Sequence, residues 1–485
     1  MKNMSIWQDY NNNYSYPRLE ENLNLDILII GGGITGCSTF YQFKDDKRKI
    51  ALVEKNKIGN GATSRSSAKV TFLQEDIYTK LNNIFGLRKT SLYYKSQKEA
   101  LGILKDIVKE ENISCDLKVS DSILYTMNKA NIKRIEEEKR LLVSFGEKVL
   151  DITNLPNGLK VESGFTVNNT YIFHPLKFVK NIIKKSLTPN HLVYENTKIT
   201  KIEKEDNYFK CYTDTNIIKT KQIVLALHYP YFLFPYLMPL KCYLEKSYLA
   251  CSKTEDTYSF NAINIEKPLN SMRYYKDYHL TVSSSKNLAF GSDDIKMVND
   301  LKENTKIQDI TYLWSNHDLM TLDHLPLIGF IDDNLILATG YNTWGNSNSL
   351  IASKIIKDLL SNKESIYQDL FDPKRGLNIQ KLINYPLNIF SNIYSFVGSK
   401  INKNKDYYQG NPYFTKKDGK NIAIYKDSDG KEHIIYNKCP HLKCSLVFNE
   451  VEKTWDCPCH GSKFDLDGKC ILGPSNYDIG YKNNQ

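Results

Sequence analysis

The hydrophobic pattern alternates between short apolar runs and longer helical patterns over much of the chain. The apolar run 25–30 precedes a glycine turn and a helix-compatible stretch at 37–43, and a second apolar run occupies 50–53. Another apolar run lies at 222–227, and 334–360 has the pattern of a strand, a glycine turn and a helix. Short apolar runs alternating with helices are typical of buried parallel strands. The pattern predicts a doubly wound α/β domain.

A different pattern in the middle of the chain indicates antiparallel structure. Residues 241–291 alternate apolar and polar positions and contain many tyrosines, which predicts an antiparallel sheet (α+β) with Tyr248 on one strand. Residues 196–202 alternate in the same way and predict another strand. Charged helical patterns at 82–110 and 130–144 predict surface helices.

The C-terminal part has a third pattern. Short strands separated by Asp-Gly turns predict a small all-β domain over 405–485. Residues 372–404 mix Pro, Asn and Lys and predict a connector, with one amphipathic helix at about 383–401. The chain is therefore divided into a main domain, 1–371, the connector and the small domain.

The first glycine turn has the spacing of a dinucleotide-binding motif. Gly31, Gly33 and Gly36 form G-x-G-x-x-G between a strand and a helix. Gly31 permits the tight turn, Gly33 lets the backbone approach a pyrophosphate, and Gly36 lets the helix pack closely on the strand. Glu54 ends the second strand, where a carboxylate would bind ribose hydroxyls. We expect a dinucleotide at this turn.

The small domain contains two boxes of metal-binding residues. Cys439 and His441 form C-x-H, and Cys457 and His460 form C-x-x-H fifteen residues later. Two loops that each offer one Cys and one His suit a Rieske [2Fe–2S] cluster, in which two His replace two Cys on one iron. The alternative is a structural zinc site, although zinc fingers usually pair Cys with Cys and His with His.

Composition limits the partners and the compartment. The net charge of +10 is spread over scattered lysines without a long basic block, so we expect no nucleic-acid partner. Five of the ten cysteines fall in the last fifty residues, and the others are dispersed, which indicates a reducing, cytoplasmic location. The polar N-terminus resembles no signal peptide. The uncharged run 223–240 contains three prolines, so no transmembrane anchor is expected.

The loop 59–67, rich in small and hydroxyl residues, and the segment 334–360 resemble the D-amino-acid oxidase, glycine oxidase and sarcosine oxidase superfamily. The resemblance implies an FAD-binding domain with an antiparallel substrate sheet that roofs the flavin. It also implies FAD contacts at seven positions: Thr63, Ser64, Arg65, Ile199, Gly340, Trp344 and Gly345. No Cys lies in 313–345, where covalent members attach the flavin, so noncovalent FAD is expected.

The two Cys/His boxes resemble the soluble Rieske domain of cytochrome bc-type complexes. The resemblance implies a disulfide between Cys444 and Cys459 that clamps the two loops. It also implies that Ser462 donates a hydrogen bond to a bridging sulfide. Phe464 stands where the family has a Tyr that hydrogen-bonds a ligand thiolate. Hydrogen bonds to cluster sulfurs help to set the potential, so we expect a lower potential than in the respiratory proteins.

Together, the two resemblances imply a flavin oxidoreductase joined to a one-electron carrier. We expect a dehydrogenase, rather than an oxidase, that oxidises a small amine or amino acid and exchanges single electrons with a protein or a quinone. Catalytic residues are hard to name because the cofactor carries the chemistry. The candidates are Arg65, His174 and Tyr248. Arg65 binds either a substrate carboxylate or the flavin diphosphate, and His174 either contacts substrate or braces the loop before Pro175.

Two other functions remain open at this stage. One is an NAD(P)H-linked enzyme like ferredoxin reductases, which needs a second dinucleotide fold, and the sequence contains no second G-x-G-x-x-G. The other is a flavin and iron–sulfur redox sensor or assembly protein without turnover.

Overall fold

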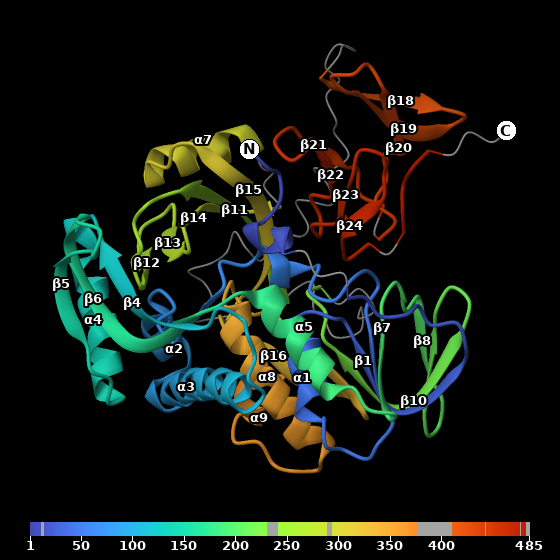
Figure 1. Cartoon of the computed structure of the whole chain (residues 1–485), viewed down its shortest axis with the longest axis horizontal. Coiled ribbons are helices and arrows are strands. Elements are labelled where there is room, and N and C mark those ends of the chain that lie inside the picture. Colours follow the sequence, from blue (N-terminus) through green and yellow to red (C-terminus); the bar gives the residue numbers. More distant parts are fainter. Residues whose placement is uncertain are drawn as a thin grey trace.

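The structure is a computed structural model that describes residues 1–10, 14–229, 241–288, 293–376, 410–441, 443–475 and 477–481. Its helices and strands form a large body and a smaller C-terminal lobe (Figure 1). The predicted connector lies largely outside the described residues, and the predicted helix at 383–401 lies wholly outside them. The division at residues 371 and 405 therefore stays a prediction.

The first sheet is the predicted doubly wound sheet. Its strands, in spatial order, are β16 (Leu327–Asp332), β17 (Leu335–Thr339), β10 (Ile217–Leu225), β1 (Leu23–Ile30), β2 (Ile50–Val53) and β7 (His191–Tyr194). The strands from β17 to β7 run parallel, and most of their residues are buried because both faces are covered. Two further strands extend β10 antiparallel: β8 (Lys201–Lys204) and β9 (Phe209–Tyr212).

Helices cover this sheet and the space beside it. Three helices pack against one another beside the sheet: α1 (Ile34–Gln42), α5 (Pro175–Ser186) and α8 (Gly345–Leu360). The remaining helices are α2 (Ile77–Phe85), α3 (Leu87–Glu110), α4 (Ile132–Ser144), α7 (Asp294–Thr305) and α9 (Gln368–Phe371). Short 3-10 helices are η1 (Ile6–Asp9), η2 (Ala62–Arg65) and η3 (Lys129–Asn131).

The second sheet is the predicted antiparallel one, but it is larger than the sequence indicated. Its strands, in spatial order, are β15 (Ile310–Thr321), β11 (Cys242–Lys253), β14 (Tyr278–Asn287), β13 (Asn270–Tyr275), β12 (Phe260–Asn264), β4 (Lys118–Thr126), β6 (Lys160–Ile172) and β3 (Lys69–Val70), with β5 (Leu150–Asn154) beside β6. The pair β12 and β4 runs parallel, joining two antiparallel halves. Segments distant in sequence thus complete one sheet.

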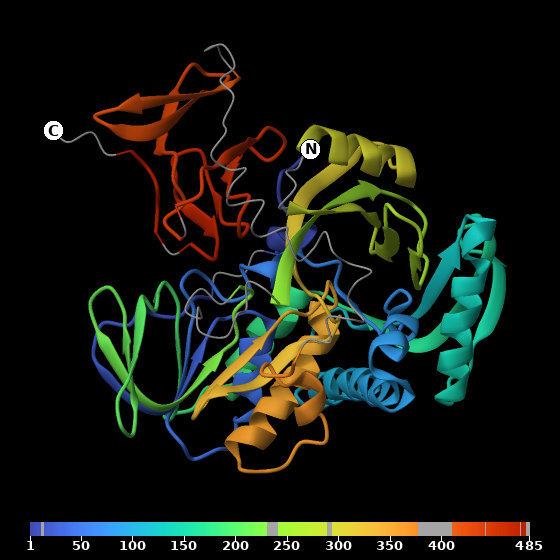
Figure 2. The ribbon, with the colours of Figure 1, turned by 180° about the vertical axis from the view of Figure 1, so that it is seen from behind.

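The C-terminal lobe is the predicted small all-β domain. It contains a sheet of β18 (Pro412–Lys417), β19 (Lys420–Lys426) and β20 (Glu432–Tyr436) and a sheet of β21 (Val447–Asn449), β22 (Thr454–Asp456), β23 (Lys463–Phe464) and β24 (Cys470–Leu472). All pairs are antiparallel. In both views the lobe lies beside β11 and β15 (Figures 1 and 2).

Two predicted boundaries were wrong. The predicted helix at 82–110 is two helices, separated at Gly86, whose φ of 79° is left-handed. The predicted strand at 196–202 begins only at Lys201, and Ile199 lies in the loop before it. The helix predicted from about Ser347 to Leu360 is α8, which begins at Gly345.

Candidate functional site

A cavity lies where the carboxyl ends of the parallel strands meet the second sheet. The strand ends contribute residues such as Ile30, Glu54, Ala226 and Thr339, and the second sheet contributes residues such as Leu249 and Val282. In open α/β sheets, ligands bind in the crevice at the carboxyl ends of the strands. The cavity is therefore the expected position for the predicted dinucleotide.

The glycine turn has no space for side chains. A Cβ on Gly31 would lie 2.3 Å from the Ala226 carbonyl oxygen, and the φ of Gly31 is +112°. A Cβ on Gly36 would lie 1.9 Å from the Gly31 carbonyl oxygen. Gly33 is the N-cap of α1 and lines the cavity, so the positive end of the helix dipole points into it. This cradle fits a pyrophosphate.

Glu54 and Thr63 line the same end of the cavity. The Glu54 carboxylate accepts hydrogen bonds from the backbone N–H groups of Gly32, at 2.8 Å, and Asn56, at 2.9 Å. Burial raises the pKa of Glu54 above its usual value. The Thr63 Oγ1 accepts from the Ile34 N–H at 2.9 Å, at the start of α1. Both side chains are held where ribose and phosphate groups of a dinucleotide would lie.

The remaining predicted FAD contacts divide into two groups. Ile199, Arg65, Gly340, Trp344 and Gly345 line the cavity. Ser64 does not: it is buried, and its hydroxyl donates to the Gly61 carbonyl oxygen at 3.0 Å.

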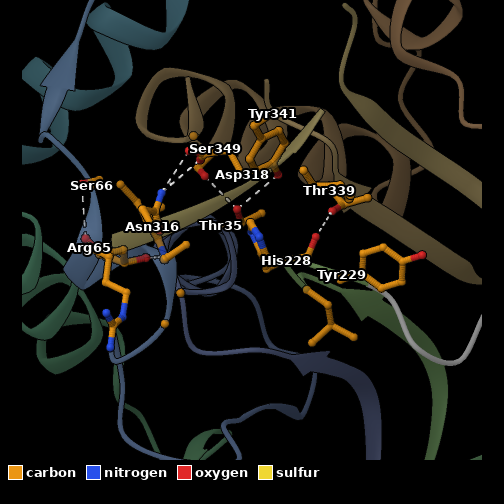
Figure 3. A pocket seen from close by; sticks show the side chains of 18 of the residues that line it. Thr35, Arg65, Ser66, His228, Tyr229, Asn316, Asp318, Thr339, Tyr341 and Ser349 are labelled. Atoms are coloured by element: carbon orange, nitrogen blue, oxygen red, sulfur yellow. Dashed lines mark hydrogen bonds between the residues drawn. The ribbon is translucent and has the colours of Figure 1, made fainter. Parts of the chain in front are cut away.

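The N-terminus of α8 is fixed by a hydrogen-bonded group on its cavity side (Figure 3). The Thr35 hydroxyl donates to Tyr341 Oη at 3.1 Å and lies 2.8 Å from Ser349 Oγ. The first residue of α8, Gly345, and its N-cap, Trp344, both line the cavity. Because the N-terminus of α8 carries a partial positive charge and is held rigidly at the cavity, it would stabilise an anionic reduced flavin there.

Sequence reasoning missed Lys69, a buried cation that lines the cavity. Its Nζ donates to Ser271 Oγ and lies 5.5 Å from the Trp344 ring centroid. Burial, and secondarily the charge of Arg273, lowers the pKa of Lys69 to about 7. The sequence does contain a signal for this buried lysine, because Lys69 lies within a stretch of apolar and β-branched residues.

Two polar residues of β15, Asn316 and Asp318, were also missed. The Asn316 amide donates to both carboxylate oxygens of Asp318, at 3.1 and 3.2 Å, and both residues line the cavity (Figure 3). Burial raises the pKa of Asp318 to about 7, with a further contribution from Glu245 on the facing strand. The sequence signal was their alternating position within β15.

The three candidate catalytic residues are placed differently. Tyr248 points away from the cavity, because its strand neighbours Ser247 and Leu249 line it, and Tyr248 contacts Asn449 instead. His174 is not among the cavity-lining residues. It is the N-cap of α5, and its Nδ1 accepts from the Lys177 N–H at 3.3 Å. Neither residue is among those that line the cavity, and His174 takes the other role suggested for it, bracing the loop before Pro175.

Arg65 lines the cavity, but its guanidinium also faces the small domain. Its Nη1 lies 3.7 Å from Glu452 Oε1 and donates to the Ser315 carbonyl oxygen at 3.3 Å. The Nε is buried without a partner. An ion pair with Glu452 is a role that the sequence did not suggest.

The Cys/His boxes lie on two adjacent loops of the small domain. Cys439 and His441 follow β20, and Cys457 and His460 lie between β22 and β23. The two His ring centroids are 4.8 Å apart, and the Cys457 thiol is hydrogen-bonded to Cys439. Both histidines have a buried Nδ1 without a hydrogen-bond partner. Two thiols and two orphaned imidazole nitrogens converging on one place fit a Rieske cluster.

The residues around these ligands also match the resemblance. Cys444 and Cys459 form a disulfide that joins the two loops. Ser462 Oγ accepts from the Ser475 N–H at 2.8 Å, which leaves its own hydroxyl hydrogen for another acceptor. Phe464 is fully buried in the core of this domain.

The cavity and the ligand loops are in contact. Tyr229, just beyond β10, lines the cavity, and its ring centroid is 5.0 Å from that of His460 and 6.1 Å from that of His441. From the small domain, residues Ile471, Leu472, Gly473 and Pro474 line the same cavity.

Comparison with known proteins identifies both domains. Residues 26–359 match the family described as FAD dependent oxidoreductase. The chain belongs to this family. Residues 399–480 match the Rieske [2Fe-2S] domain. The cavity residues fit FAD and the two Cys/His boxes fit a Rieske-type [2Fe–2S] cluster, so the protein is an FAD-dependent oxidoreductase with a Rieske domain.

Relatives share the whole architecture or the main domain. The Rieske 2Fe-2S iron-sulfur protein YhfW of Bacillus subtilis is 30% identical, over 97% of this chain and 96% of its own length. Glycine oxidase from Geobacillus kaustophilus has a similar fold, with a TM-score of 0.62 and 14% identity over 73% of this chain and 100% of that chain. L-proline dehydrogenase from P. horikoshii also has a similar fold, with a TM-score of 0.62 and 17% identity over 74% of this chain and 98% of that chain.

The described helices can be compared with the requirements of a membrane-spanning helix. None of them combines the length and the apolar character needed to cross a membrane.

Proposed function

We propose that this protein dehydrogenates a small amine or amino acid at noncovalent FAD and passes the electrons singly through the Rieske cluster to a protein or quinone acceptor. The observation that carries the proposal is the position of Tyr229, which lines the cavity and touches both cluster histidines. The substrate loses two electrons, and the cluster accepts one at a time. Two one-electron steps to the acceptor therefore complete one turnover.

FAD supplies the two-electron chemistry when it is bound, and the chain holds it in place. Gly31 and Gly33 receive the diphosphate, Gly36 lets α1 pack closely on the turn, and Glu54 binds ribose. Thr63 and Ile199 line the nucleotide end, and Gly340, Trp344 and Gly345 place the α8 N-terminus beside the ring. Ser64 stabilises the loop 59–67 through its hydrogen bond to the Gly61 carbonyl oxygen. For the cluster, the proposed ligands are Cys439, His441, Cys457 and His460.

The substrate class is supported by the cavity and by the fold. Two proteins with similar folds are a glycine oxidase and an L-proline dehydrogenase. Leu249, Ile263 and Val282 form an apolar wall suited to a small substrate, and Lys69 offers a buried ammonium group to a substrate carboxylate. A carboxylate beside Lys69 would offset the burial that lowers its pKa.

An anaerobic substrate screen tests this function. The purified protein is mixed with amino acids, amines and hydroxy acids, and the FAD absorbance is followed together with the EPR signal of the reduced cluster. The proposal predicts that a small amine or amino acid bleaches the flavin and that the cluster signal then rises. Bleaching by NADH alone, or by none of the amines, would contradict it.

A further inference from the structure

The two faces of the β11–β15 pair serve different domains. Side chains alternate across a strand, so Ser247 and Asn316, which line the cavity, point opposite to their neighbours. On the other face, Lys246 lies across from His317 and Tyr248 lies across from Ser315. Each of these four residues contacts the Rieske domain, and Lys246 also contacts Asp294 of α7. The β11–β15 pair therefore has the flavin cavity on one face and the docked domain on the other, and the two meet beyond the strands at Tyr229 and Ile471–Pro474.

Six charged groups meet at the contact and form what we call the six-charge network. The members are Arg65, Lys246, Asp294, Glu452, Asp456 and Lys463. Lys246 Nζ lies 2.6 Å from Asp294 Oδ1 and 3.1 Å from Asp456 Oδ2. Lys463 pairs with Glu452 and lies 3.7 Å from Asp456. No side chain in the network is more than 11% exposed.

The network is neutral only when the domains are docked. The main domain contributes Arg65, Lys246 and Asp294, and the Rieske domain contributes the other three members. The main domain thus contributes an excess of positive charge, and the Rieske domain contributes an excess of negative charge. A buried charge without a partner is strongly unfavourable. A Rieske domain shifted along the same face would keep these charges away from water without their partners, so the network favours one docked position.

Further hydrogen bonds between the two domains fix the same position. The Ser315 N–H donates to Glu452 Oε1 at 3.1 Å, and Asn449 Nδ2 donates to Tyr248 Oη at 3.1 Å. His317 Nδ1 lies 3.0 Å from the carbonyl oxygen of Gly461, the residue after the ligand His460. The docking contact therefore reaches the ligand loop itself.

This position turns the histidine side of the cluster toward the flavin cavity. Tyr229 fills the space between, with its ring against His460 and, more distantly, His441. Backbone and side chains of Ile471, Leu472 and Pro474 close the cavity from the Rieske side. In this docked position the ring of Tyr229 therefore connects the cavity to both histidines.

We propose that the six-charge network holds the Rieske domain in a single position, and that Tyr229 is the contact through which electrons pass from the flavin to the histidine side of the cluster. The inference rests on the proposed function. Each transfer removes one electron from reduced FAD and converts one ferric iron of the cluster to ferrous. The one-electron acceptor reoxidises the cluster before the second transfer.

The docking is tested with Lys246→Met, which leaves Asp294 and Asp456 facing each other without their shared cation. Glu452→Gln is a second, nearly isosteric variant. Lys296→Met is the control, because Lys296 forms an exposed ion pair with Asp300 on α7. FAD absorbance and the cluster EPR signal establish that each variant retains both cofactors. Hydrogen exchange of the 313–317 peptide, which contains the Ser315 N–H, reports docking.

The expected result is a rise of at least tenfold in exchange of that peptide in Lys246→Met and Glu452→Gln, but not in Lys296→Met. The rate of cluster reduction after photoreduction of FAD should fall at least tenfold in the same two variants. Unchanged exchange and an unchanged rate in both would overturn the single docked position. A wild-type protein whose flavin is reduced while the cluster stays oxidised would instead contradict the proposed function.

The role of Tyr229 is tested with Tyr229→Leu and Tyr229→Phe. Removal of the ring in Tyr229→Leu should slow cluster reduction at least tenfold, and Tyr229→Phe, which restores a ring, should recover most of the loss. The midpoint potentials of FAD and cluster, measured in each variant, separate a lost contact from a changed driving force. Equal rates in the wild type and in Tyr229→Leu, at unchanged potentials, would remove Tyr229 from the path.

Discussion

Single residues set the properties of the cluster, and Phe464 is the clearest case. It is fully buried in the core around the ligands and has no hydroxyl. Phe464→Tyr should add a donor toward a ligand thiolate. Hydrogen bonds to charged groups contribute about 1.5–3 kcal/mol, and about 1.4 kcal/mol corresponds to 59 mV for one electron. A redox titration should therefore show a rise of up to about 130 mV.

The matched change is Ser462→Ala, which removes a hydroxyl from the same loop. The potential should fall in this variant, since a donor to cluster sulfur is lost. No rise in Phe464→Tyr together with no fall in Ser462→Ala would mean that these positions do not act on the cluster sulfurs.

Lys69 allows a prediction of how stability depends on pH. Its pKa is lowered on folding to about 7, so the folded chain binds its proton less well than the unfolded chain. The resulting loss of stability grows as the pH falls from about 10 toward 7 and is constant below that. Lys69→Met should remove the loss and stabilise the FAD-free protein at pH 7 by at least about 1 kcal/mol.

Thermal unfolding of the FAD-free protein between pH 6 and pH 10 measures this effect. Lys354→Met is the control, because Lys354 is partly exposed on α8 and pairs with Asp358. A stabilisation in Lys69→Met that stays constant from pH 7 to pH 10 would contradict the assigned titration.

Residue identity and spacing along the chain predicted the cluster ligands, because all four lie within two short loops. The same reasoning failed where a role depends on distant contacts. Tyr248 was placed on the correct strand, but the sequence does not reveal which face of that strand meets the cavity. Arg65 pairs with Glu452, almost four hundred residues away, and Lys69 and Tyr229 acquire their surroundings only from the assembled sheets.

At the scale of elements, the contact between α1 and β1 determines the nucleotide site. A Cβ at Gly36 would lie 1.9 Å from the Gly31 carbonyl oxygen, so Gly36→Ala must push the helix away from the turn. We expect FAD binding to weaken by at least tenfold, because the pyrophosphate cradle is built from both elements. Fluorescence titration of the FAD-free protein with FAD measures the affinity.

Gly102→Ala is the control for this change. Gly102 also lies inside a helix, α3, and a Cβ there would meet nothing within 4 Å. Alanine should stabilise that helix by about 0.5–1 kcal/mol and leave FAD affinity unchanged. Equal FAD affinity in the Gly36→Ala and Gly102→Ala proteins would show that the cradle tolerates the displacement.

Most elements could be predicted because periodicity and glycine turns are local signals. The doubly wound strands, the sheet over 241–291 and the small β domain were all recognised in this way. The break at Gly86 was missed because the helical pattern continues on both sides of it. The parallel pairing of β12 with β4 was missed because it joins segments more than a hundred residues apart.

For the whole molecule, the arrangement of the domains matters most. The Rieske lobe rests against β11 and β15 on their outer face (Figure 2). Residues of the inner face line the flavin cavity. Tyr229 and the segment from Ile471 to Pro474 bring the two sites into contact at the edge of these strands. The account therefore treats the chain as one electron-transfer unit, in which the flavin donates within its own molecule.

The most direct test is the dependence of cluster reduction on protein concentration. FAD in the wild-type holoprotein is photoreduced without oxygen, and the cluster EPR signal is followed by rapid freezing at several protein concentrations. The account predicts that the cluster becomes reduced with a first-order rate that is the same at every concentration. A rate that rises in proportion to concentration, or a cluster that stays oxidised, would contradict it.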